Sequence, residues 1–168
     1  DTRTIFASAV LKRHNGFGKG ADNIANTADD ISAIYVLNNY RGTGPTTVSA
    51  VINMNSFSGV NVGANPRVGA SPANDLGAAN APNHDYGVYG NEGKRGIGDI
   101  DISEDGQTLY VMNMNSSQLV LLNVSNPVAP TLIGAYTIPK PSGAPASDTY
   151  RPWGIGVFNG QVYVGGVM

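Results

Sequence analysis

A strand–turn–strand pattern occurs twice in this sequence, at residues 98–113 and again at residues 153–164. The turn of the first copy is Asp105-Gly106, and the turn of the second copy is Asn159-Gly160. Asp-Gly and Asn-Gly pairs adopt the positive φ angles that a two-residue hairpin turn requires, and alternating apolar residues flank both pairs. The sequence therefore predicts two β-hairpins of the same kind.

A recurring hairpin indicates a larger unit, because a two-stranded hairpin cannot shelter its own apolar face from water. Two more apolar strand patterns, at residues 118–124 and 131–138, follow the first hairpin after short turns. Together with the hairpin they predict a four-stranded antiparallel meander from residue 97 to 138. Such a meander is the size of one blade of a β-propeller.

Three further strand patterns, at residues 4–11, 32–37 and 46–52, precede the meander. We interpret them as the second, third and fourth strands of an incomplete blade. The hairpin at 153–167 then supplies the first two strands of a following blade. The fold class that we expect is therefore all-β, with about two blades' worth of four-stranded antiparallel meanders.

We divide the chain, residues 1–168, into four parts of a partial β-propeller: an incomplete blade at 1–54, a long loop or insertion at 55–95, a complete blade at 96–138 and the start of the next blade at 151–168. Propellers typically hold about four to eight blades, and an open stack leaves unpaired strand edges. We therefore expect a fragment of a larger ring, completed by blades from the same chain or from other chains. The strand-like sequence of the last residues, Val164 to Met168, favours truncation.

One part of the complete blade resembles the repeat of YVTN-type β-propellers. Those repeats pair a Ser-x-Asp-Gly turn with a Leu-Tyr-Val-x-Asn strand, and this chain has Ser-Glu-Asp-Gly at 103–106 and Leu-Tyr-Val-Met-Asn at 109–113. The apolar strand Gln-Leu-Val-Leu-Leu-Asn-Val at 118–124 follows in the matching place.

A longer series of motifs is similar to the propeller region of large bacterial secreted or cell-surface proteins, which often also carry repeated SdrD B-like modules. The series is Leu-Lys-Arg-His-Asn-Gly-Phe-Gly at 11–18, Asn-Pro-Arg at 65–67, Gly-Ile-Gly-Asp-Ile-Asp-Ile-Ser at 96–103 and Arg-Pro-Trp-Gly-Ile at 151–155. The resemblance implies an extracellular or cell-surface protein with a role in adhesion. It implies no catalytic residues.

Charge and composition exclude several classes of partner and site. Only 13% of the 168 residues are charged and the formal net charge is -2, so no electrostatic field attracts nucleic acid. There are 0 cysteines, which excludes disulfides and thiolate metal sites. No apolar run reaches the ~18 residues of a spanning helix, so we expect no membrane span.

Two groups of aspartates are candidate metal ligands. Asp22, Asp29 and Asp30 place carboxylate oxygens in one loop, as Ca²⁺ requires, although their spacing does not match a known calcium loop. The alternative is a solvated polar loop, and no cofactor other than Ca²⁺ is expected. Asp99 and Asp101 lie on one face of a predicted strand, where they can bind a cation or act as an acid/base pair. The alternative is that one carboxylate accepts hydrogen bonds from neighbouring backbone while the other faces water.

Candidate binding residues are fewer. His14, and His84 with Asp85 and Tyr86, are polar side chains of predicted loops that can form a binding site, or simply polar surface. Trp153 follows a proline at the start of a predicted strand. Its ring can stack on a sugar or anchor a protein partner, or it can pack in the core.

These observations favour a non-enzymatic binding or scaffold propeller whose loops at 14–30 and 55–95 contact a protein or glycan. An alternative is a propeller hydrolase or lyase with a central carboxylate site at Asp99 and Asp101. Another is a structural subunit of an extracellular assembly. A convergent acid pair with room for substrate would favour the enzyme.

Overall fold

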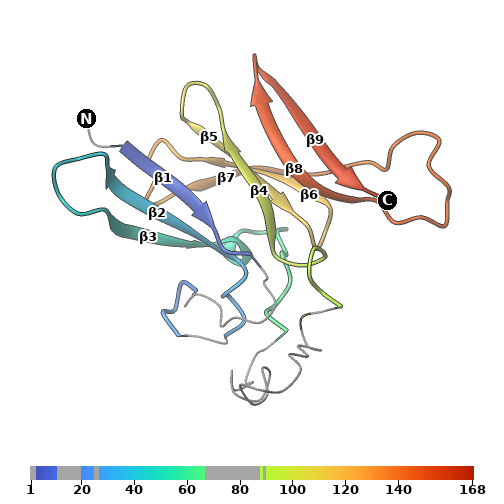
Figure 1. Cartoon of the computed structure of the whole chain (residues 1–168), viewed down its shortest axis with the longest axis horizontal. Helices are drawn as coiled ribbons and strands as arrows, with labels where there is room; N and C mark the ends of the chain where they lie inside the picture. Colours follow the sequence, from blue (N-terminus) through green and yellow to red (C-terminus); the bar gives the residue numbers. More distant parts are fainter. Residues whose placement is uncertain (1–2, 11–19, 25–26, 67–87, 89) are drawn as a thin grey trace, which may run out of the picture.

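The protein is all-β, with three antiparallel sheets (Figure 1). The computed structural model describes residues 3–10, 20–24, 27–66, 88 and 90–168. Within the described residues, no helix is both long and apolar enough to cross a membrane.

The first sheet has three strands in the order β1-β2-β3. They are β1 (Arg3–Ser8), β2 (Ala33–Tyr40) and β3 (Thr47–Asn53), and a single 3-10 turn, η1 (Met54–Ser56), follows the last of them. The strands predicted at 4–11, 32–37 and 46–52 are therefore present. The first is shorter than expected, because its pairing with β2 ends in the contact between the Ala9 N–H and the Ala33 carbonyl.

The second sheet is the meander predicted for residues 97–138, and this prediction is confirmed. Its order is β4-β5-β6-β7, with every neighbouring pair antiparallel. The strands are β4 (Ile97–Ile102), β5 (Thr108–Asn113), β6 (Gln118–Asn123) and β7 (Thr131–Thr137). The two-residue turn predicted at Asp105-Gly106 is wrong: residues 103–107 separate β4 from β5, and of the pair only Gly106 has a positive φ, 71°. The longer loop is held by side chains, because Asp105 accepts the Gln107 N–H at 3.0 Å and the Ser103 hydroxyl accepts the Thr108 N–H at 2.9 Å.

The third sheet is the second predicted hairpin, formed by β8 (Arg151–Phe158) and β9 (Gln161–Val167). Its turn residues, Asn159 and Gly160, both have positive φ angles, 51° and 71°. This combination is typical of a type I′ turn, which matches the twist of paired strands.

The first and second sheets share one strand register. In the first sheet the pairing of β2 with β3 has a bulge between Val36 and Leu37, after which Leu37 pairs with Val48. In the second sheet the pairing of β6 with β7 has the same irregularity between Leu121 and Leu122, after which Leu122 pairs with Leu132. The pairing on the other side of β2 and β6 has the same register, because Leu37 also pairs with Ile5 of β1 and Leu122 with Leu109 of β5. Strands β1-β2-β3 are therefore equivalent to β5-β6-β7.

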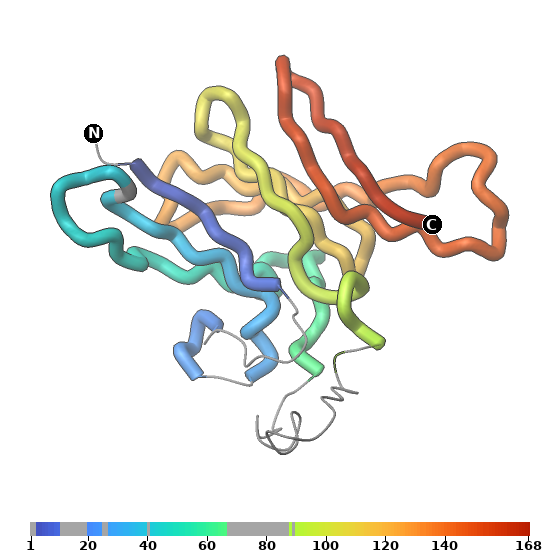
Figure 2. Tube along the Cα trace, in the orientation of Figure 1, coloured from blue at the N-terminus to red at the C-terminus, as the bar shows by residue number. Residues whose placement is uncertain are grey.

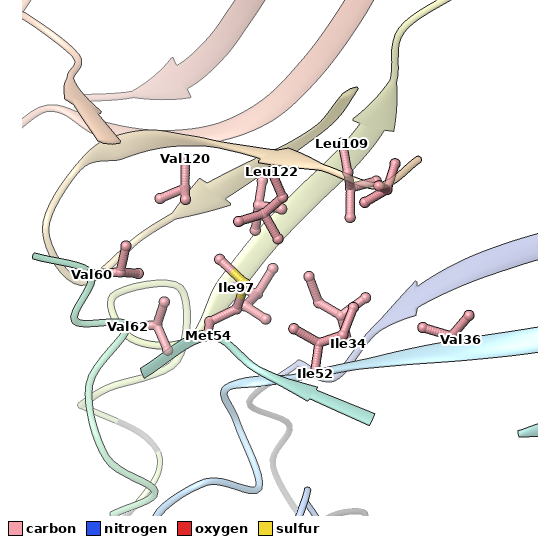
Figure 3. Packing of buried hydrophobic residues seen from close by; sticks show 12 residues of the cluster. Ile34, Val36, Ile52, Met54, Val60, Val62, Ile97, Leu109, Val120 and Leu122 are labelled. Atoms are coloured by element: carbon pink, nitrogen blue, oxygen red, sulfur yellow. The ribbon is translucent and has the colours of Figure 1, made fainter. Parts of the chain in front are cut away.

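The main hydrophobic core lies between these two sheets (Figure 3). Ile34 and Val36 of β2 face Val120 and Leu122 of β6, and all four side chains are fully buried. The core also includes Val60 and Val62, from the segment that the sequence assigned to a long loop. The described beginning of that segment, residues 57–66, is therefore packed against the sheets rather than projecting from them.

Strand β4 lies between the other two sheets, in contact with β1 on one side and with β8 on the other (Figure 2). The three strands that meet here, β1, β4 and β8, are each the first strand of their sheet, and we call the edge that each forms the inner edge of that sheet. The residues at these two contacts form the candidate functional site.

Candidate functional site

Three carboxylates of the β4 hairpin accept hydrogen bonds from the backbone of β8 and of the turn that follows it. Asp99 accepts a hydrogen bond from the Ile155 N–H at 3.1 Å, Asp101 from the Val157 N–H at 2.7 Å and Glu104 from the Asn159 N–H at 2.7 Å. The acceptors at 99, 101 and 104 and their donors at 155, 157 and 159 occur in the same order along the chain, so β4 and β8 run parallel. We call these three contacts the carboxylate ladder.

Each aspartate of the ladder bridges two strands. The second oxygen of Asp99 accepts the Ile100 N–H at 3.0 Å, and that of Asp101 accepts the Ile102 N–H at 2.8 Å. In their own hairpins Ile100 pairs with Val111 and Ile155 with Val164, which makes these two isoleucines equivalent. The ladder therefore joins like backbone positions of two successive first strands.

Gly98 allows the two strands to approach this closely. A Cβ atom at this position would lie 2.7 Å from the Trp153 carbonyl oxygen and 3.2 Å from the Met112 side chain. Real Cβ atoms do not come that close to backbone, so glycine is required for the contact.

The sequence placed Asp99 and Asp101 on one face correctly, and of the uses we considered for them, the structure shows backbone hydrogen bonding. Both accept backbone hydrogen bonds with both oxygens, so neither simply faces water. Glu104 was missed. Its partner, the Asn159 N–H, is 55 residues away, and the one sequence signal for the same role is that Glu104 follows the Asp-x-Asp pattern by three residues.

On its other side, β4 forms a groove with β1. The groove has a volume of about 260 Å³, and its walls include Thr4 and Phe6 from β1, and Ile100 and Ile102 from β4. A second hollow of about 720 Å³ shares Thr4, Phe6 and Ile102 and extends past the Glu104 turn. Within the described residues, no strand pairs with the edge of β1 that lines this groove, whereas β4 pairs with the matching edge of β5 in the second sheet.

The loop before β2 brings Asp22, Asp29 and Asp30 together, as the sequence predicted. One oxygen from each lies within 4.8 Å of the others. Asp30 is fully buried and accepts hydrogen bonds from the Thr27 backbone N–H and from the Asn65 side-chain amide, each at 3.2 Å. The role of Asn65 was not visible in the sequence, because 35 residues separate it from Asp30.

Asp29 closes this loop. One of its oxygens accepts the N–H groups of Ala21 and Asp22, at 2.5 and 3.2 Å, and the other accepts the Thr27 hydroxyl at 2.8 Å. Burial acts to raise the pKa of Asp29, but these hydrogen bonds outweigh burial and hold its pKa below the usual value. The donor set fits a hard cation. The same oxygens are also accounted for by the hydrogen bonds that shape the loop.

Of the candidate binding residues, only Trp153 lies within the described residues. His14, His84, Asp85 and Tyr86 lie outside the described residues. Trp153 is 48% exposed at the start of β8, and its ring lies close to Gly93, near the end of the segment at 55–95. The half-exposed ring is therefore available for contact beside this segment.

The fold and site define an all-β protein of antiparallel sheets joined through their inner strands. Comparison with protein-family models, with curated proteins and with solved structures found no match to this chain.

Proposed function

We propose that this chain is part of a β-propeller that serves a bacterial surface or secreted protein as an extracellular binding or scaffold module. In this proposal β1-β2-β3 are the second, third and fourth strands of one blade, β4 to β7 form a complete blade and β8-β9 are the first two strands of another. The loops at one end of the ring present contacts to a protein or glycan partner.

The observation that carries the proposal is the head-to-tail packing of the two equivalent sheets. The first sheet buries Ile34 and Val36 in the shared core, and the second buries Val120 and Leu122. By the shared register, Val120 and Leu122 correspond to Tyr35 and Leu37, which point to the opposite face of the first sheet. The front of one sheet thus packs on the back of the next. Repetition of such a contact generates a ring when the rotation closes.

The carboxylate ladder supports the same arrangement. Radially repeated sheets place their first strands side by side around a central axis, and β4 and β8 lie parallel and adjacent through the ladder. The ladder also favours a scaffold over the alternative hydrolase or lyase. Asp99 and Asp101 each already accept two backbone N–H groups, whereas an acid/base pair must exchange protons with a substrate.

Trp153 supports a contact surface next to the segment at 55–95. Its exposed ring is planar and rigid, which suits stacking on a sugar or anchoring to a protein. Phe158, at the other end of β8, is 71% exposed and lies at the hairpin turn, away from this segment. The two aromatic residues form a matched pair for a binding test.

The test is to measure binding of the purified chain to a glycan array and to a panel of extracellular matrix and cell-surface proteins. We expect a saturable interaction that Trp153→Ala weakens by about tenfold, as expected for loss of an aromatic anchor, and that Phe158→Ala leaves unchanged. Chemical turnover of a panel member that is abolished in Asp99→Asn would instead establish the enzyme. Equal losses in the two aromatic variants, or no interaction at all, would contradict the proposed surface.

A further inference from the structure

The edge of β1 that faces β4 is the one open inner edge in the described part of the first two sheets. From Ile5 onward strand β1 corresponds to β5, because Ile5 and Leu109 hold the same place in the shared register; before Ile5, β1 has an irregularity that β5 lacks. In the second sheet, β4 pairs along the inner edge of β5. Among the described residues, no strand pairs with that edge of β1, and the groove lies there instead.

The groove has the character of a strand site. Phe6 and Ile100 are half-buried against the main core, and Ile102 is 38% exposed on the opposite wall. Along β1 the Ala9 N–H points to β2, so in an antiparallel ladder the N–H and C=O groups of Ser8 and Phe6 point the other way, toward the groove. An exposed row of such groups is a template for a further strand.

We propose that this edge captures an extended polypeptide strand of the same kind as β4, which pairs antiparallel with β1 in the groove. We infer the kind of occupant from the second sheet, in which β4, with the sequence Ile-Gly-Asp-Ile-Asp-Ile, pairs along the equivalent edge. The inference deepens the proposed function and rests on it for the equivalence of the two sheets in one ring. Strand addition of this kind gains affinity from main-chain hydrogen bonds and specificity from alternate side chains.

The register of the captured strand follows from β4 and β5. Asp101 pairs with Tyr110 and Ile100 with Val111, and these partners correspond to Phe6 and Ala7 of β1. The second aspartate of the captured strand therefore lies opposite Phe6. Its two aspartates then lie beside the N–H groups of Ile100 and Ile102, which correspond to those of Ile155 and Val157 but already donate to Asp99 and Asp101.

A synthetic peptide with the sequence of residues 95–103 is the probe. Labelled with a fluorophore, it is expected to bind the purified chain saturably by fluorescence anisotropy. Hydrogen exchange followed by NMR is expected to show new protection of the Phe6 and Ser8 amides. The N–H of Ser103, directly after β4, donates to the Thr108 carbonyl, so the N–H of Asp101, two residues earlier, also faces the partner strand. A peptide N-methylated at the position of Asp101 is expected to bind about tenfold more weakly, because it cannot make this backbone hydrogen bond.

Two protein variants provide a matched control. Ile102→Arg fills the groove wall and is expected to weaken binding by about tenfold through loss of apolar contact. Ile133→Arg makes the same change on β7, where the side chain is 50% exposed and outside the groove, and is expected to have no effect. Far-UV circular dichroism verifies that both variants are folded.

Equal binding of the N-methylated peptide, equal effects of the two variants or no saturable binding would overturn strand capture. So would a dimer with protected Phe6 and Ser8 amides that the peptide does not dissociate, because a second copy would then occupy the edge. Intact binding to the glycan or protein panel alongside a failure of the peptide would overturn strand capture alone and leave the proposed function standing.

Discussion

Asp101 joins two sheets by accepting the backbone N–H of Ile102 with one oxygen and the backbone N–H of Val157 with the other, at 2.8 and 2.7 Å. The two donors, at positions 102 and 157, are 55 residues apart in sequence and belong to different sheets. A single side chain thus replaces the backbone carbonyls that would join neighbouring strands within one sheet.

Removing this link is expected to destabilise the fold. Asp101→Ala leaves the part-buried Val157 N–H without its acceptor, and charged acceptors of this kind contribute about 1.5–3 kcal/mol to the free energy of unfolding. Urea unfolding of the variant and of Asp148→Ala, which removes an exposed loop carboxylate, measures the difference. Equal unfolding midpoints for the two variants would show that the ladder does not stabilise the protein.

The close approach of β4 and β8 leads to a second prediction. Gly98→Ala places a Cβ 2.7 Å from the Trp153 carbonyl oxygen, so the strands must separate, at a cost of about 1–3 kcal/mol. Gly154→Ala is the matched control, since an added Cβ there meets nothing within 4 Å. Thermal unfolding is expected to show a lower midpoint for Gly98→Ala alone. A similar loss in both variants would mean that glycine flexibility, not the strand contact, is responsible.

Val62 tests whether the beginning of the segment at 55–95 is part of the core. Its side chain is fully buried, and truncation in Val62→Ala is expected to cost about 1.5–3 kcal/mol of unfolding free energy. Val48→Ala, at a side chain that is 55% exposed, is expected to cost little. Chemical denaturation of both variants gives the comparison, and an unaffected Val62→Ala would place this segment outside the core.

The lowered pKa of Asp29 predicts a pH dependence. Because the folded pKa lies below the unfolded value of about 3.9, the contribution of Asp29 to stability is present above about pH 4 and is lost as pH falls through the lower folded pKa. The difference in unfolding free energy between the natural protein and Asp29→Asn is therefore expected to be larger at pH 7 than at pH 2.5. Denaturant titrations at both pH values measure it. A difference that does not change with pH would contradict the assigned role of the carboxylate.

Local sequence patterns determined the hairpins and the meander. The Asn159-Gly160 pair forms the two-residue turn that it predicts, whereas Asp105-Gly106 marks the position of a turn but not its length. Period-two apolar residues on each side of both turns specify which face of each strand is buried. The grouping of Asp22, Asp29 and Asp30 was also readable, because they lie within nine residues of one another. In each case the interacting residues are near in the chain, so the sequence carries the information locally.

Only the tertiary structure decided what the carboxylates of β4 do. The Asp-x-Asp spacing put Asp99 and Asp101 on one face, but it did not show that the Ile155 and Val157 N–H groups would meet them. The same holds for Val62, whose burial depends on how two sheets pack. Alternation along a strand specifies a face, whereas the identity of what covers that face is set by the packing of segments far apart in the chain.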